Sequence, residues 1–155
     1  MNTLLYFMEK SKKNETILFI FLILPLFCGC VNDYYRPNKK GYQVTMEVTG
    51  YCDCGKCCGW ERNWLFQPVF KKGKNKGKRK EIGRCADGTM AKKGTIAADT
   101  RYYPFGTQFY IPGYGYGTVH DRGGAIKRNK IDLFFNSHQE ALNWGRKKMQ
   151  VIIYK

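Results

Sequence analysis

Apolar and polar residues alternate along several short segments, a pattern typical of strands that are buried on one face. In 43–51 (QVTMEVTGY), Val44, Met46 and Val48 alternate with polar residues, so this segment predicts a half-buried strand. Short strands joined by glycine- and proline-rich turns favour a mainly β fold that closes into a small barrel, because closure leaves no exposed sheet edge. The other predicted strands are 95–98, 107–111, 116–120, 131–135 and 151–154.

One segment near the C-terminus, 137–145, has the features of a helix. Ser137 is a favourable N-cap, and Glu140 follows it at the spacing of a capping box. Gly145 is placed to end the helix. The chain therefore predicts a small β-barrel with one short helix near the C-terminus.

The first 29 residues have the pattern of an export signal. Lysines precede the apolar run 17–27, which is too short for a comfortable membrane span, and Gly29-Cys30 follows at once. This resembles a bacterial lipoprotein signal with lipidation at Cys30. A cleaved signal without lipidation and an uncleaved anchor are the alternatives, and all three place the domain outside the cytoplasm. The expected location is the cell envelope, with the protein anchored at a membrane (outer membrane or periplasmic face). Residues 30–42 are polar and predict a tether.

The chain is strongly basic, with 27 Lys and Arg against 12 Asp and Glu and a net charge of +15. Most of this excess lies after the signal segment, so the folded part should favour an anionic partner. Nucleic acid would be the default for so basic a chain. The export signal and the lack of a nucleic-acid-binding motif instead favour an envelope polymer.

Five cysteines follow the first predicted strand, and several arrangements are open to them. Cys54-x-x-Cys57 has a spacing used by zinc sites, and four thiolates could bind zinc. A disulfide framework suits an exported protein better and is the favoured expectation, and reduced, buried cysteines are a third arrangement. The expectation is therefore no cofactor, with a lower-ranked zinc site at Cys52, Cys54, Cys57 and Cys85.

A catalytic cysteine is disfavoured by the histidines. The chain has only two, His120 and His138, and neither has an obvious pairing with a cysteine in the sequence.

Residues 60–84 interrupt the strand pattern as a basic insertion. The run 71–80 holds seven Lys and Arg residues and predicts a solvated, mobile loop, or an arm for an anionic polymer or lipid head groups. Trp60 and Trp64 are placed either to stack on sugar rings or to fill a small core beneath the loop.

Three aspartates, Asp99, Asp121 and Asp132, lie in or beside predicted strands, where carboxylates tend to project into a cleft suited to acid–base chemistry. The surrounding motifs resemble the 3D domain, a family named for three aspartates and found in bacterial wall-associated proteins and in the membrane-bound lytic transglycosylase A family. The motifs are GTIAAD (94–99), PFGTQFYIPGYGYG (104–117), HDRGGAIK (120–127), IDLFF (131–135) and EALNWG (140–145).

The resemblance implies a double-psi β-barrel over residues 43–155 and cleavage of peptidoglycan strands. A lytic transglycosylase breaks the β-1,4 bond between N-acetylmuramic acid and N-acetylglucosamine and forms a 1,6-anhydro product. By this resemblance Asp132 is the general acid and base, Asp121 is its neighbour, and Asp99 supports the backbone or the substrate. Thr89, Lys127, Gly123 and Gly124 are expected to contact the substrate.

Two positions depart from the family pattern, because Arg122 stands where threonine is usual and Arg128 where glycine is usual. Positive charge beside Asp132 would favour its ionised form and weaken it as an acid. A glycan-binding module without catalysis, anchored in the envelope, is therefore the main alternative. A structural envelope protein stabilised by disulfides or zinc is the other.

Overall fold

The structure is a computed structural model that describes residues 40–154. The predicted signal segment, the lipidation site Cys30 and nearly all of the predicted tether lie outside the described residues. Within residues 40–154, no helix is both long enough and apolar enough to cross a membrane.

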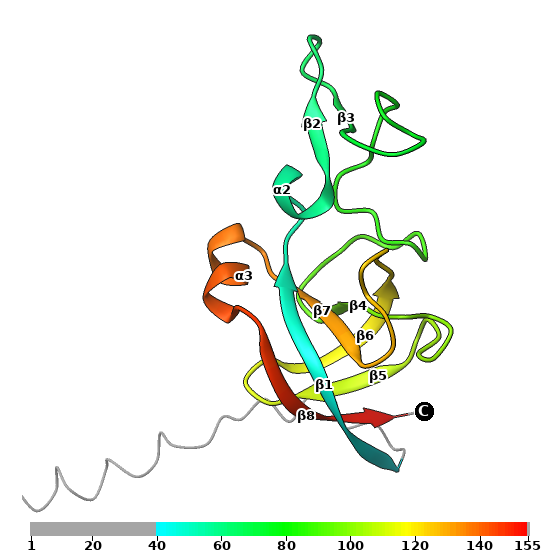
Figure 1. Cartoon of the computed structure of the whole chain (residues 1–155), viewed down its shortest axis with the longest axis vertical. Coiled ribbons are helices and arrows are strands. Elements are labelled where there is room, and N and C mark those ends of the chain that lie inside the picture. The colour runs from blue at the N-terminus through cyan, green and yellow to red at the C-terminus, as the bar shows by residue number, and fades with distance from the viewer. Residues whose placement is uncertain (1–39, 155) are drawn as a thin grey trace, which may run out of the picture. The chain divides into compact units, whose positions relative to one another are not determined.

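Six strands close into a barrel in the order β1-β7-β4-β6-β5-β8 (Figure 1). Most neighbours are antiparallel, but β1 runs parallel to β7, and β4 runs parallel to β6. The predicted mainly β fold with a small barrel and a short helix near the C-terminus is confirmed. The strands are β1 (Gly41–Tyr51), β4 (Thr95–Ala97), β5 (Gln108–Ile111), β6 (Gly115–Asp121), β7 (Lys130–Phe134) and β8 (Lys147–Tyr154).

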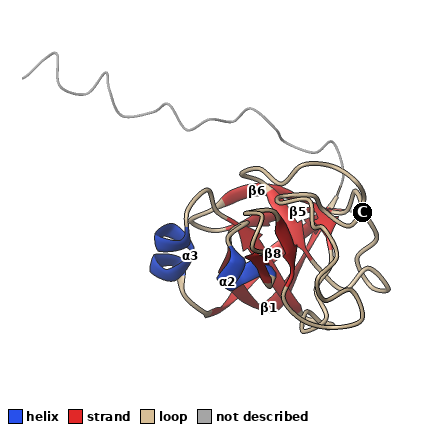
Figure 2. Ribbon diagram, turned by 90° about the horizontal axis from the view of Figure 1, so that it is seen from above, coloured by secondary structure: helices blue, strands red, loops and turns tan. Residues whose placement is uncertain are grey.

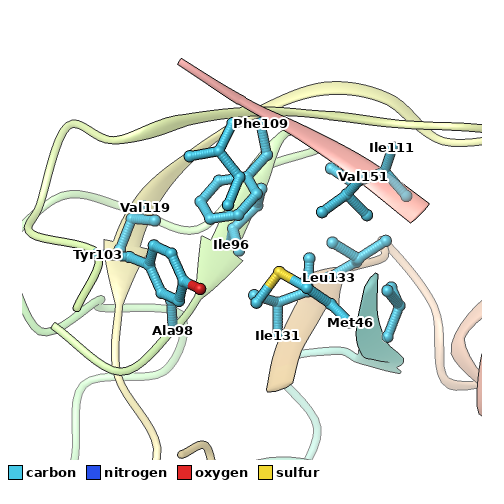
Figure 3. Packing of buried hydrophobic residues seen from close by; sticks show 12 residues of the cluster. Met46, Ile96, Ala98, Tyr103, Phe109, Ile111, Val119, Ile131, Leu133 and Val151 are labelled. Atoms are coloured by element: carbon cyan, nitrogen blue, oxygen red, sulfur yellow. The ribbon is translucent and has the colours of Figure 1, made fainter. Parts of the chain in front are cut away.

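Alternation along the strands fills the barrel with apolar side chains. On β1, Met46 and Val48 are buried inside while the intervening residues face outward, as the pattern in 43–51 predicts. Phe109 and Leu133 meet them from other strands (Figure 3). Each such side chain contributes about 1.5–3 kcal/mol on burial, so the interior of the barrel is a solid core and any binding site must lie at its outside or at its ends.

The predicted helix forms as α3 (His138–Trp144), which lies outside the ring of strands (Figure 2). Ser137 caps it, since its hydroxyl accepts a hydrogen bond from the Glu140 amide at 3.2 Å. Gly50 on β1 lets the helix approach closely, because a Cβ there would lie 3.1 Å from the carbonyl oxygen of Ala141. The helix is thereby packed against the end of β1 through its middle.

The insertion after β1 is more ordered than predicted. The predicted insertion 60–84 begins with a hairpin that projects away from the barrel (Figure 1), and one helical turn lies just before it. The basic run 71–80 folds back along this hairpin. Backbone hydrogen bonds from the Phe70 amide to the Lys78 carbonyl and from the Lys80 amide to the Pro68 carbonyl hold that run. Instead of the mobile loop expected there, it is a third segment paired alongside β3. The elements are α2 (Gly55–Cys58), β2 (Trp60–Arg62) and β3 (Pro68–Phe70).

The structure also separates the two tryptophans of the insertion. Trp60 is partly buried, and its indole N–H donates to the Asp53 carbonyl oxygen at 2.7 Å. Trp64, at the hairpin tip, is 85% exposed. Trp60 therefore packs beneath the hairpin, and Trp64 is free to meet a partner.

Candidate active site

Strand pairing brings two of the three aspartates onto one face of the sheet. Strand β4 lies between β6 and β7, and Ala97 on β4 pairs with Asp132 on one side and with Asp121 on the other. Thr49 of β1 pairs with Asp132 from the far side of β7. Paired residues point to the same face, so Thr49, Asp132, Ala97 and Asp121 form one row across four strands.

A shift in register places Asp121 in this row. Along β4 and β6, Ile96 pairs with Val119, but the next pair joins Ala97 to Asp121 and passes over His120. Such irregularities re-aim side chains, and they occur often beside active sites. Simple alternation would have put His120 opposite Ala97.

Asp132 lies in a half-buried position that favours its protonated form. Burial is the main cause that raises the pKa of this carboxyl, and the negative charge of Asp121 raises it further. A hydrogen bond from the Thr49 hydroxyl at 2.8 Å and the nearby cations Lys130 and Arg146 act in the opposite direction. Because the net direction is upward, Asp132 is better suited to donate a proton than an ordinary aspartate.

Arg122 and Arg128 are not among the groups that act most strongly on the pKa of Asp132. The main cationic influences on Asp132 come from Lys130 and Arg146, and burial outweighs both. Arg128 serves another carboxylate, since its backbone N–H donates to Asp99 at 3.1 Å. Its φ of 49° is in the left-handed region that glycine adopts without strain, which explains why glycine suits this position.

Asp121 is held in place by three donors. Its Oδ1 accepts from the backbone amides of Ala86 and Arg122, at 3.0 and 2.9 Å. Its Oδ2 accepts from the Tyr51 hydroxyl at 3.4 Å. Burial holds the pKa of Tyr51 far above its ordinary value, so this hydroxyl stays a donor. Asp121 is thus a fixed group that faces Asp132 across Ala97.

A cleft of about 420 Å³ opens over these two aspartates, within the usual size range of ligand sites. Apolar groups and a basic rim surround the two carboxylates, which suits a ligand with both apolar faces and anionic groups. The apolar lining includes Tyr51, Ala97, Ile126 and Phe134, and the basic residues are Lys80, Arg84 and Arg122.

Asp99 lies in an adjoining hollow of about 410 Å³. It is only 5% exposed, and Arg101 contacts both of its oxygens, at 2.9 and 2.7 Å. The Arg101 guanidinium is the main cause that holds the pKa of Asp99 well below its usual range. Asp99 is therefore a permanent anion that ties the 99–101 turn to residue 128, and it is not placed to donate a proton.

The residues expected to contact substrate are distributed unequally. Gly123 lines both hollows, whereas Lys127 and Gly124 line the one beside Asp99. Thr89 lines neither hollow. Its hydroxyl donates a hydrogen bond to Asp87 at 2.7 Å. Asp87 in turn contacts His120 Nδ1 at 2.6 Å, so Thr89 belongs to a separate polar cluster.

Sequence reasoning missed Thr49 and Tyr51 as site residues. Both lie on β1, far from the aspartates along the chain, and they join the site only through the parallel pairing of β1 with β7. The alternation along β1 does place Thr49 and Tyr51 on the face opposite Val48. That alternation was the one feature of the sequence that could have pointed to them as site residues.

The five cysteines of the described part form no disulfide, so the favoured disulfide framework is not what the structure shows. Three of them meet a histidine that the sequence did not connect to any cysteine. The Sγ atoms of Cys52, Cys54 and Cys57 and a ring nitrogen of His138 all lie within 4.8 Å of one another. Cys85, the fourth expected ligand, is not in this group, and burial raises the pKa of its thiol to about 11.

Residues 94–155 match the sequence profile of the 3D domain family. Two curated relatives come from Bacillus subtilis strain 168. The chain is 50% identical to "Cell wall-binding protein YocH" over 56 residues, which is 36% of the chain and 20% of that protein. It is 39% identical to "Putative cell wall shaping protein YabE" over 75 residues, or 46% and 18%. The chain thus spans about a fifth of these relatives.

Among solved structures, the chain is similar to MltA from Escherichia coli, with a TM-score of 0.39 and 21% identity over 46% of this chain and 27% of that one. An apo form of an E. coli lytic transglycosylase MltA variant aligns with a TM-score of 0.40 and 19% identity, over 50% and 29%.

Proposed function

Because residues 94–155 are a 3D domain, we propose that this protein is a peptidoglycan lytic transglycosylase. It would cleave the β-1,4 bond between N-acetylmuramic acid and N-acetylglucosamine and leave a 1,6-anhydro end. The observation that supports this most is the half-buried Asp132, which shares one cleft with Asp121.

Asp132 supplies the acid in this proposal. An acid must keep its proton until the glycosidic oxygen is in reach, and the raised pKa of Asp132 favours that state. Proton transfer to the leaving oxygen breaks the glycosidic bond, and Asp132 becomes a carboxylate. The Thr49 hydroxyl then stabilises that carboxylate through its hydrogen bond.

The second half of the reaction needs no water. The C6 hydroxyl of the muramic acid attacks its own anomeric carbon, and a group held in place so closely reacts as if at very high concentration. The Asp132 carboxylate takes the hydroxyl proton and returns to its starting state. A hydrolase would need a second carboxylate to activate water. In this proposal Asp121, fixed by Tyr51 and two amides, instead orients the substrate and raises the pKa of Asp132.

The adjoining hollow extends the same binding surface. Arg122 and Gly123 line both hollows, so a glycan strand in the cleft can continue past them toward Gly124 and Lys127. Asp99 supports this extension by holding the 99–101 turn and residue 128 together.

The names of the relatives and the N-terminal sequence support a proposed location. Both curated relatives are named for the cell wall. We place this protein in the cell envelope, with residues 1–29 as an export signal, Cys30 as the lipid attachment site at a membrane, residues 30–42 as a tether and residues 43–155 as the domain that meets the glycan.

Purified peptidoglycan tests the activity directly. The full chain, in mild detergent, should release 1,6-anhydromuropeptides that mass spectrometry detects. Asp132→Asn should lower the release by about 10²–10⁴-fold, the usual contribution of a general acid and base. Glu61→Gln changes an exposed carboxylate on the hairpin and should release product at the wild-type rate. Equal release by Asp132→Asn and wild type contradicts the assignment.

A glycan-binding module without catalysis is the second candidate, and the name "cell wall-binding" of one relative favours it. Retention of the chain on intact peptidoglycan, with no anhydro product at any pH, would support this candidate over the enzyme. In that case Arg122→Ala should release the chain from the glycan, because this residue lines both hollows.

A further inference from the structure

The three cysteines and the histidine beside the cleft are arranged as metal ligands. The Nδ1 atom of His138 lies 3.4 Å from Cys57 Sγ, 3.6 Å from Cys54 Sγ and 3.9 Å from Cys52 Sγ. The sulfurs of Cys52 and Cys57 are 3.8 Å apart. One nitrogen and three sulfurs thus converge on a common centre.

These distances fit a tetrahedron around zinc. With Zn–S bonds of about 2.3 Å and a Zn–N bond of about 2.0 Å, the edges of a regular tetrahedron are about 3.8 Å between sulfurs and about 3.5 Å from sulfur to nitrogen. The four separations given above lie within a few tenths of an ångström of these lengths. Hydrogen bonding alone does not explain the group, because three thiols share a single ring nitrogen.

We propose that Cys52, Cys54, Cys57 and His138 bind one Zn²⁺ ion in a closed, structural Cys₃His site. Soft thiolates with one imidazole in a tetrahedral arrangement select zinc over magnesium or calcium. On binding, the three thiols lose their protons to solvent and His138 ligates as the neutral ring through Nδ1. Four protein ligands leave no open position, so the ion takes no direct part in glycan chemistry.

The ligands come from three different places in the fold. Cys52 follows the end of β1, Cys54 is the N-cap of the helical turn α2 and Cys57 lies within that turn, and His138 is the first residue of α3. Between the cysteines and His138 the chain runs for 81 to 86 residues. The ion would therefore tie the start of α3 to the segment after β1.

The site also borders the cleft over Asp121 and Asp132. Asp53, Cys57 and Gly59 line the cleft and lie within the segment that the metal would hold. Zinc would fix this wall relative to Asp132, whether the cleft cleaves glycan or only binds it. The inference thus stands apart from the proposed catalytic activity.

The other two cysteines of residues 40–154, Cys58 and Cys85, serve as matched controls. Cys58 adjoins Cys57 in the chain, but its thiol donates to the Cys52 carbonyl oxygen at 3.2 Å and is outside the ligand group. Cys85 is buried elsewhere in the cleft lining. Neither is expected to contribute to metal affinity.

Metal analysis of the full chain, purified in mild detergent with reductant and zinc, tests the proposal. Wild type, Cys58→Ser and Cys85→Ser should each retain about one zinc per chain after dialysis. Cys54→Ser and His138→Ala should lose at least about tenfold in affinity. Zinc binding below one ion for every two wild-type chains, or unchanged affinity in both ligand variants, overturns the site.

Two further measurements keep the test decisive if a variant fails to fold. Cobalt added to wild type should give the intense visible absorption of a tetrahedral ion together with sulfur-to-metal charge-transfer absorption. Cys54→His should keep the tetrahedral visible absorption and show weaker charge-transfer absorption. Mass spectrometry after alkylation should find all three ligand cysteines reduced in the zinc-loaded chain. A disulfide among them in protein that takes up no zinc after reduction also overturns the proposal.

Discussion

The Thr49 hydroxyl donates a 2.8 Å hydrogen bond to Oδ1 of Asp132 across the parallel pair of β1 and β7. This contact joins residues that are 83 positions apart in the chain, and it makes Thr49 the residue that positions the proposed acid. A donor to the ionised carboxylate lowers its pKa, so this hydrogen bond sets how far burial can raise the pKa of Asp132.

Thr49→Val should therefore shift the pH dependence of glycan cleavage. Loss of the donor raises the pKa of Asp132, so the alkaline limb of the kcat/KM profile should move to higher pH, and the maximum should fall by about tenfold as the carboxyl becomes less well oriented. Thr45→Val, on an exposed position of the same strand, should leave the profile unchanged. An unmoved alkaline limb in Thr49→Val would show that Thr49 does not act on the acid.

Asp99→Asn should lower the thermal midpoint at neutral pH. The pKa of Asp99 is lowered in the folded state, so its ion pair with Arg101 stabilises the fold fully above the ordinary value of 3.8 and loses that effect as the pH falls below it. The difference in midpoint between wild type and Asp99→Asn should therefore be largest above pH 4 and shrink in more acidic solution. A difference independent of pH would assign the loss to packing alone.

The matched variant Asp132→Asn should show the opposite trend. The pKa of Asp132 is raised, so ionisation costs the fold stability as the pH rises above 3.8 and through the raised pKa. This variant should melt at or above the wild-type midpoint at neutral pH and match wild type near pH 3. Calorimetry across this pH range measures both variants.

Arg128→Gly should be tolerated or mildly stabilising. Arg128 has a φ of 49°, a left-handed conformation that costs a residue with a side chain about 1–2 kcal/mol. Glycine removes that cost but loses about 0.5–1 kcal/mol through its freedom in the unfolded chain. The free energy of unfolding should rise by about 0 to 1.5 kcal/mol in urea titration. A fall in the free energy of unfolding would instead show that the arginine side chain itself stabilises the loop.

Trp64→Ala should weaken glycan binding and leave stability unchanged. Trp64 is 85% exposed at the tip of a hairpin whose base, at Gly59, lines the cleft. Its removal should change the free energy of unfolding by less than about 0.5 kcal/mol while it reduces retention on peptidoglycan. Trp60→Phe provides the contrast, because it loses the hydrogen bond to Asp53 and should cost about 1 kcal/mol of stability. Full retention of Trp64→Ala on peptidoglycan would contradict a glycan contact at the tip.

Local pattern determined the secondary structure well. Alternation at Val44, Met46 and Val48 identified β1 and its buried face, and Ser137 with Glu140 identified the start of α3. These features depend on residues within one strand or one helical turn, where side-chain period and capping follow from the sequence alone. The motifs around the three aspartates likewise indicated the 3D domain.

Only the tertiary structure decided how these elements meet. Alternation shows which residues face inward, but it does not show that β1 lies parallel to β7, that the register shifts at His120, or that Thr49 reaches Asp132. The spacing of the cysteines indicated a possible metal site but proposed Cys85 as the fourth ligand, where the fold supplies His138. Pairing between distant segments is set by closure of the whole barrel, and no local period in the chain carries that information.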